Sequence, residues 1–121
     1  MQPAKSFRDL IVWQKSHRFV LTVYKITRSS CPREENFGLT SQFRRAAVSI
    51  AANIADGFRK QSKADKARIL NISEGSLEEC RYYIIFAKDL EYMNDDTLWE
   101  LTEEIGRMLN TYRTNILTSN S

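Results

Sequence analysis

The segment from Gln42 to Gly57 decides the fold and reads Gln-Phe-Arg-Arg-Ala-Ala-Val-Ser-Ile-Ala-Ala-Asn-Ile-Ala-Asp-Gly. Its apolar residues recur at spacings of three and four, which indicates one stripe of an α-helix. The other positions are mostly alanine and serine, so neighbouring helices can approach closely on several sides. A helix of this kind is predicted to lie in the middle of a bundle, with its stripe inward. The stripe consists of Phe43, Ala47, Ile50 and Ile54.

Upstream, a helix is predicted over residues 9–29, and it carries two apolar stripes. The stripe assigned to the bundle repeats every three or four residues and comprises Leu10, Trp13, His17, Val20, Tyr24 and Thr27. A second stripe lies roughly 130° away around the helix at 100° per residue. We expect this second stripe to be covered by another molecule. It comprises Val12, Phe19, Val23 and Ile26.

The central helix is predicted over residues 41–56. Thr40 or Ser41 is the expected N-cap, and Gly57 is expected to end the helix in a left-handed conformation. Asn53 is polar within this small-residue helix, so its amide is expected to bond a neighbouring backbone or side chain, and a hydrogen bond between helices would fix their register. Trp13, Asn53 and Gly57 are therefore given structural roles.

The longest helix is predicted over residues 63–91, with Ser62 as its N-cap. Gly75 lies inside this helix, where glycine costs about 1 kcal/mol relative to alanine, so close approach of another helix, or a kink, is expected there. The second half is apolar nearly all round, which indicates contact with another subunit. Its candidate interface residues are Tyr82, Tyr83, Ile85 and Phe86.

A fourth helix is predicted over residues 96–117, capped by Asn94, Asp95 or Asp96. No strand-like alternation competes with these helices, and three short connections make them sequential antiparallel neighbours. The predicted fold is all-α, a single domain over residues 1–121 built as an up-down-up-down antiparallel four-helix bundle.

Several function classes are excluded by the composition. No apolar run approaches the ~20 residues that span a bilayer, and the N-terminal residues carry no secretory signal. Cys31 and Cys80 are isolated and are expected to be reduced thiols in a cytoplasmic protein. His17 is the one histidine, and no zinc pattern, reactive-serine motif or phosphate-binding glycine loop accompanies it. We therefore expect a non-enzymatic protein without metal or cofactor.

The basic residues are concentrated in the first half of the chain. Residues 1–68 contain 14 Lys and Arg against 5 Asp and Glu, whereas residues 69–121 contain 4 against 10. Such a cluster is either an ordinary solvated surface or a site for the phosphates of nucleic acid, bound without sequence specificity. The candidate residues for this site are Arg44, Arg45, Arg59, Lys60, Lys63, Lys66 and Arg68.

The sequence resembles the bacterial four-helix-bundle family also called the ribosomal RNA intervening-sequence proteins. The resemblance covers about residues 7–117 and is carried by Phe7, Asp9-Leu10, Val12-Trp13-Gln14, Tyr24, Pro32, Phe37-Gly38-Leu39, Gln42, Arg44 to Ile50, Asn53-Ile54-Ala55, Gly57 and Gly75 to Glu79. The chain departs from the usual pattern at His17, Asp56 and Cys80, where a small residue, glutamate and a larger aliphatic residue are common.

The resemblance implies a small cytoplasmic bundle that assembles as a homopentamer. A relative, the accessory variability protein of diversity-generating retroelements, partners a reverse transcriptase and binds nucleic acid through a basic surface. The leading hypothesis is therefore a homo-oligomer that binds the backbone of RNA or DNA, as an accessory to a nucleic-acid enzyme. The alternative is a protein-protein interaction scaffold without a nucleic-acid role.

Overall fold

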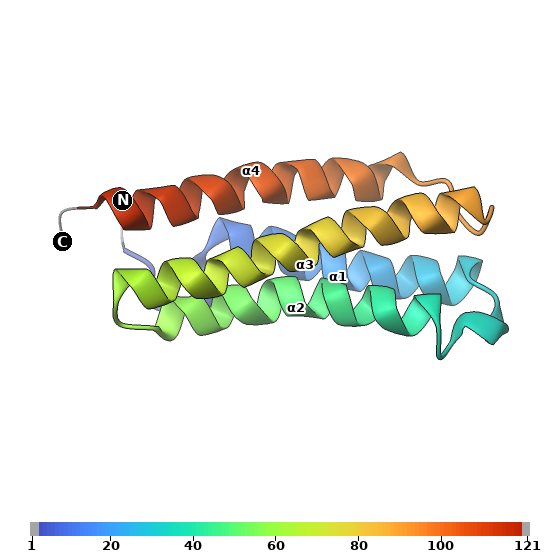
Figure 1. Cartoon of the computed structure of the whole chain (residues 1–121), viewed down its shortest axis with the longest axis horizontal. Helices are drawn as coiled ribbons and strands as arrows, with labels where there is room; N and C mark the ends of the chain where they lie inside the picture. Colours follow the sequence, from blue (N-terminus) through green and yellow to red (C-terminus); the bar gives the residue numbers. More distant parts are fainter. Residues whose placement is uncertain (1–2, 120–121) are drawn as a thin grey trace.

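Four long helices make up most of the protein in the computed structural model, which describes residues 3–119. They are α1 (Ile11–Ser30), α2 (Leu39–Arg59), α3 (Lys63–Asp89) and α4 (Asp96–Thr118). Two 3-10 turns, η1 (Phe7–Asp9) and η2 (Arg33–Glu35), precede α1 and α2. Successive helices run in opposite directions along one long axis (Figure 1). The predicted all-α four-helix bundle is confirmed, and residues 3–119 contain no strand.

The ends of the helices follow the predicted capping only in part. The Ser62 hydroxyl accepts from the Asp65 amide, as predicted, and Asp95 is the residue that caps α4, at 3.1 Å from the Leu98 amide. Thr40 and Ser41 lie inside α2, so the prediction that one of them caps it is wrong. The Glu35 carboxylate instead accepts from the Leu39 amide at 3.1 Å.

The end of α2 also differs from the prediction. Gly57 does not have a positive φ, and α2 continues through it to Arg59. Gly57 is buried, and a Cβ at this position would lie 3.4 Å from the Leu70 side chain. The glycine therefore permits close packing of α2 against α3 rather than ending the helix.

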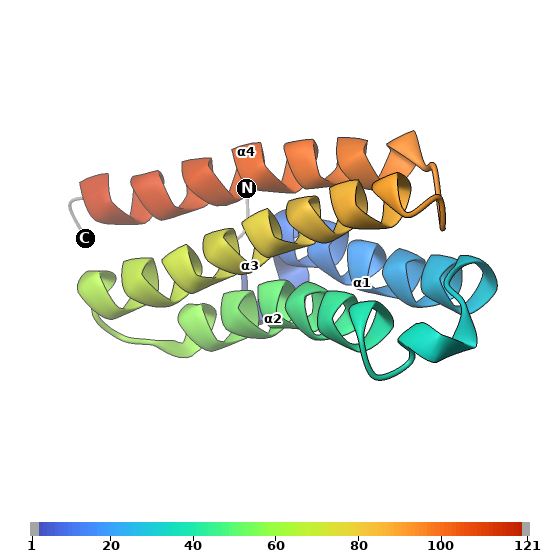
Figure 2. The same cartoon turned by 45° about the vertical axis from the view of Figure 1, so that its right-hand side comes forward.

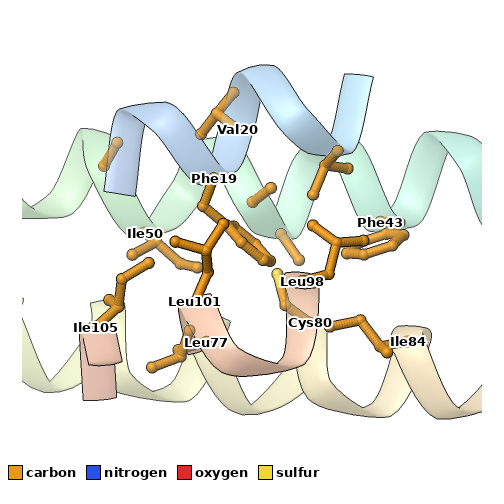
Figure 3. Packing of buried hydrophobic residues seen from close by; sticks show 14 of the residues in the cluster. Phe19, Val20, Phe43, Ile50, Leu77, Cys80, Ile84, Leu98, Leu101 and Ile105 are labelled. Carbon is orange, nitrogen blue, oxygen red and sulfur yellow. The ribbon is translucent and has the colours of Figure 1, made fainter. Parts of the chain in front are cut away.

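The core lies along the axis of the bundle and receives side chains from all four helices. The predicted inward stripe of α2 is confirmed, because Phe43, Ala47, Ile50 and Ile54 are all fully buried. Figure 3 shows Phe43 and Ile50 facing Cys80 of α3 and Leu98 of α4 across this core. Burial raises the pKa of the Cys80 thiol far above its usual range, so this cysteine is an inert core residue.

The orientation predicted for α1 is wrong. Val12, Phe19 and Val23, expected on the outer stripe, are buried in the core, and Ile26 is half-buried. His17 and Tyr24, expected inward, are exposed, while Leu10 and Trp13 are half-buried at the boundary. Val20 and Thr27 of the predicted inner stripe are buried as expected, so the core face of α1 takes residues from both predicted stripes.

Ser16, which neither predicted stripe contained, explains part of the wrong assignment of α1, and Thr27 shows the same way of burying a hydroxyl. Ser16 and Thr27 are buried on the same face as Phe19. Their hydroxyls donate to the carbonyls of Val12 and Val23, each at 2.7 Å and one turn earlier in the helix. Because the helix backbone satisfies these hydroxyls, the core face tolerates polar residues that interrupt its apolar pattern.

Hydroxyl groups connect α2 to α3. The oxygens of Ser49 and Ser76 are 2.8 Å apart, and the Ser73 hydroxyl donates to the Ile50 carbonyl at 2.9 Å. Asn53 donates to the Ser49 carbonyl and hydroxyl at 2.8 and 3.0 Å, as expected for a satisfied amide. Its partner is on its own helix, so the predicted bond from Asn53 to another helix is wrong, and Ser49 and Ser73 make the bonds between α2 and α3.

Gly75 does not mark a helix crossing. It is exposed on α3, and a Cβ built there meets no atom within 4 Å. The prediction of a close approach by another helix of the same chain is therefore wrong.

Candidate nucleic-acid and self-association surfaces

The seven basic residues proposed for nucleic-acid binding do not form one surface. Arg45 and Arg59 are 14 positions apart on α2, which separates them by about 21 Å at 1.5 Å per residue. Arg44 and Arg45 belong to the end of the bundle where α2 begins, and the other five residues lie around the α2–α3 connection at the opposite end (Figure 1).

Arg44 is a structural residue. Its guanidinium lies 4.5 Å from the centre of the Tyr24 ring. Its Nε donates to the Thr27 hydroxyl at 2.9 Å and Nη2 donates to the Tyr24 carbonyl at 3.3 Å. These contacts fasten α2 to α1 and leave little of the cation for a ligand. Arg45, by contrast, is exposed.

We call the five residues around the α2–α3 connection the basic turn. Two of them satisfy helix C-termini, where backbone carbonyls lack partners. The Lys66 amine donates to the carbonyls of Gly57 and Phe58 at 3.3 and 2.7 Å, and the Lys63 amine donates to the Ser119 carbonyl after α4. Burial lowers the pKa of Lys66. The basic turn comprises Arg59, Lys60, Lys63, Lys66 and Arg68.

The other cations of the basic turn face solvent more freely. Lys60 pairs with Asp56 at 3.3 Å and Arg68 with Asp65 at 3.9 Å. Surface pairs of this kind contribute under about 1 kcal/mol and exchange readily with other anions. Arg59 is exposed and makes no ion pair within residues 3–119. Arg59, Lys60 and Arg68 are therefore the cations of this turn that a phosphate could reach.

The second half of α3 presents apolar side chains to solvent, as its sequence predicted. Tyr82 is 59% exposed, Ile85 47% and Phe86 39%, and Tyr83 is half-buried. The Tyr82 ring stacks on Phe86 with their centres 5.8 Å apart, and Tyr83 packs on the core residue Phe43 at 6.0 Å. We call Tyr82, Tyr83, Ile85 and Phe86 the α3 aromatic face.

Exposed acidic residues lie on and just after the part of α3 that carries the α3 aromatic face, and Lys88 is the exposed basic residue among them. Glu79, Asp89 and Glu91 are exposed on or just after the same helix. Partial burial raises the pKa of the Tyr83 hydroxyl, and the nearby Glu79 carboxylate raises it further. Because carboxylates repel phosphate, this surface suits a protein partner better than a nucleic acid.

Phe37 is a surface residue that the sequence analysis did not select. It lies between η2 and α2 and is 98% exposed. Because it belongs to no helical stripe, periodicity gives no signal for it. The available signal is an isolated aromatic residue in a connection that is otherwise polar and charged.

Chemical sites are not evident in residues 3–119. No three His, Cys, Asp or Glu side chains lie close enough there to hold a metal ion. His17 is exposed, and its ring stacks on Trp13 with the centres 5.0 Å apart, so its one aromatic contact within residues 3–119 is structural. None of the described helices is both long and apolar enough to cross a membrane.

Comparison with known proteins gives a family and a fold. The family model described as 23S rRNA-intervening sequence protein matches residues 8–111. A crystal structure of a protein of unknown function from the S23 ribosomal protein family of Bacteroides thetaiotaomicron VPI-5482 is similar, with a TM-score of 0.76 and 24% identity, covering 86% of this chain and 96% of that one. No curated protein matches the chain.

Proposed function

We propose that this chain, which belongs to the 23S rRNA-intervening sequence protein family, is a non-enzymatic bundle. In this proposal it self-associates and binds the backbone of RNA or DNA. Membership of this family is what the sequence resemblance indicated. The fivefold assembly and the reverse-transcriptase partner implied by that resemblance belong to the proposal.

The α3 aromatic face is the observation that carries self-association. Three of its four side chains are at least 39% exposed although they are large and apolar. Contiguous apolar surface of this kind on a bundle typically marks a protein interface. Tyr83 is already ordered by its contact with the core residue Phe43, and the Tyr82 ring packs on Tyr83 and Phe86, so little side-chain entropy is lost when a partner covers them.

The basic turn supports the nucleic-acid part of the proposal. Five cations stand there against Asp56 and Asp65, and three of them remain accessible. A single turn of this kind binds phosphates weakly. In a ring each copy repeats it, and several weak contacts on one strand then act together. Binding of this kind is expected to weaken steeply with salt and to discriminate poorly between sequences.

Gel-shift titration at two salt concentrations tests the nucleic-acid part. The test variant carries Arg59→Gln with Arg68→Gln, because neither side chain caps a helix. The matched control carries Arg18→Gln with Arg28→Gln, which removes the same charge from exposed positions on α1. Each lost phosphate contact should lower the slope of log affinity against log salt by about 0.7 to 0.9.

The test variant should thus bind more weakly and with a smaller salt slope per copy, while the control keeps the wild-type slope. Both should sediment as the wild type does. No retardation of duplex or single-stranded probes by the wild type, even at low salt, would remove the nucleic-acid part and leave the protein-protein scaffold. The acidic surroundings of the α3 aromatic face favour that second function.

A further inference from the structure

Phe37 is held on a rigid loop. The Gly38 amide donates to the Glu35 carbonyl at 2.9 Å, and the Asn36 amide donates to the Arg33 carbonyl at 3.0 Å. The Glu35 carboxylate accepts from the Leu39 amide at 3.1 Å and from the Tyr92 hydroxyl at 2.9 Å. One oxygen thus fixes the start of α2 and the other fixes the α3–α4 turn. The backbone that carries Phe37 is therefore fixed before any partner arrives.

The Phe37 side chain does not contribute to the packing of residues 3–119. Phe37 makes no aromatic contact and does not join the core, and 98% of its surface faces solvent. Preorganised aromatic anchors of this kind contribute strongly to protein interfaces because ordering them costs little on binding. Phe37 is therefore a projecting side chain, or knob, that fills no pocket, or hole, within residues 3–119.

A hole of suitable size lies between the end of α3 and the start of α4. This pocket has a volume of about 370 Å³, which exceeds that of a phenylalanine side chain. Ile85, Met93 and Trp99 provide apolar walls, with Lys88 and Asp96 at the rim. Trp99 is 36% exposed and Ile85 47%, so the apolar wall faces solvent in a single copy.

The charges that flank the knob complement those that flank the hole. Arg33 and Glu34 are exposed beside Phe37, and Lys88 and Asp96 are exposed at the pocket. None of these four side chains forms an ion pair within residues 3–119. A docked loop therefore finds an acid for its arginine and an amine for its glutamate, and such complementarity favours one orientation over others.

Both features lie at the same end of the bundle. In Figures 1 and 2 the helices form two layers, α1 with α2 and α3 with α4. The α1–α2 connection belongs to the first layer, and the α3–α4 turn lies above it in the second. Copies can then be related by rotation about an axis parallel to the helices, with almost no shift along it. A head-to-tail contact repeated by pure rotation closes into a ring instead of growing into a filament.

We propose that Phe37 of one copy inserts into the pocket walled by Ile85, Met93 and Trp99 of the next copy, and that this contact defines the head-to-tail direction of the assembly. The inference rests on the proposed self-association and names the contact that drives it. Ile85 belongs both to the pocket and to the α3 aromatic face, so the inserted loop and the covered face are parts of one continuous interface.

Sedimentation velocity over a range of concentrations tests the contact with Phe37→Ser and the control Leu21→Ser. Leu21 is 57% exposed on α1 and lies far from the pocket in sequence, so its loss removes similar apolar surface without touching the knob. Because the Phe37 ring is unsupported by its own chain, the variant should fold as the wild type does by circular dichroism. Loss of one buried phenylalanine should raise the dissociation constant about 10- to 100-fold.

Cross-linking locates the hole. With the photoreactive analogue p-benzoylphenylalanine at position 37, irradiation should join that position to residues 84–99 of a second copy. Wild-type protein that remains monomeric at every concentration would overturn both this contact and the proposed self-association. If the wild type assembles and Phe37→Ser assembles equally well, or if the cross-links map outside residues 84–99, the contact alone is wrong.

Discussion

At the scale of single residues, one carboxylate holds the loop end of the bundle together. Glu35 bonds the first amide of α2 through one oxygen and the Tyr92 hydroxyl through the other. A Cβ at Gly38 would lie 2.7 Å from this carboxylate, so another residue there would displace the oxygen that bonds the Leu39 amide. The segment that precedes α2 therefore has a structural role, and its hydrogen bonds are centred on Glu35.

Tyr92→Phe tests this network through pH. The hydrogen bond to Glu35, followed by burial, raises the pKa of Tyr92 above its ordinary value of about 10. A raised pKa means that the stabilisation is complete below about pH 10 and disappears as the pH rises through the folded-state pKa. Wild-type stability should therefore decline above pH 10 more steeply than that of the variant, which is already less stable at pH 7.

Urea unfolding at pH 7, 9, 10 and 11 measures this difference. Tyr24→Phe is the control, because it removes a tyrosine hydroxyl while keeping the ring beneath Arg44. An equal alkaline decline in wild type and Tyr92→Phe would show that the Glu35 bond does not contribute to folding.

At the scale of helices, the bundle is fastened unevenly. α2 and α3 share serine contacts and the close packing of Gly57 against Leu70. α3 and α4 are joined by the ion pair of Arg113 with Glu74 at 2.7 Å and by the hydrogen bond that Arg81 donates to the Thr102 carbonyl at 3.1 Å. The α1–α4 side is looser, with a groove of about 1090 Å³ between the N-terminal segment and α4.

Gly75→Ala tests whether the exposed glycine within α3 is merely tolerated, and Gly57→Ala provides a buried glycine for comparison. Gly75 is exposed in the interior of α3 with no atom near its Cβ position, so alanine should raise the free energy of unfolding by about 0.5 to 1 kcal/mol. Gly57→Ala is the comparison at a buried position, where the added Cβ would lie in van der Waals contact with Leu70 at 3.4 Å, whereas the Cβ at Gly75 meets open space. Urea unfolding of both variants at low protein concentration measures the difference. A Gly75→Ala variant that gains no stability would show that helix propensity does not limit the stability of α3 at this position.

The same scale explains what the sequence could and could not predict. The α2 stripe was predictable because Phe43, Ile50 and Ile54 carry the apolar signal without interruption. The core face of α1 was predictable only in part, because Ser16 bonds its own backbone and so occupies a core position that neither predicted stripe contained. The basic turn was predictable as a charge cluster, but the sequence does not reveal that Lys63 and Lys66 are directed to helix C-termini.

At the scale of the whole molecule, the surface divides by chemistry. One end carries the basic turn, and the opposite end carries Phe37 and the pocket near Trp99. If copies stand side by side around a ring with parallel axes, every basic turn comes to one rim and every knob-and-hole contact to the other. Assembly and nucleic-acid binding would then be separable functions of the two ends.

Dilution should reveal the assembly through Trp99. Trp99 lines the pocket and is partly exposed, so covering it with Phe37 of the next copy should shift its fluorescence to shorter wavelength. Trp13→Phe removes the other tryptophan, whose ring is stacked on His17, and leaves Trp99 as the reporter. On dilution the emission should move to longer wavelength at the concentration where light scattering reports dissociation. The melting temperature should fall at the same concentration, because partners that bind only the folded state stabilise it by mass action.

The same background with Phe37→Ser should show the long-wavelength emission at concentrations about 10- to 100-fold higher. Emission that stays constant while scattering falls would mean that the copies meet on a surface that leaves Trp99 uncovered, and the α3 aromatic face would then have to hold the assembly by itself.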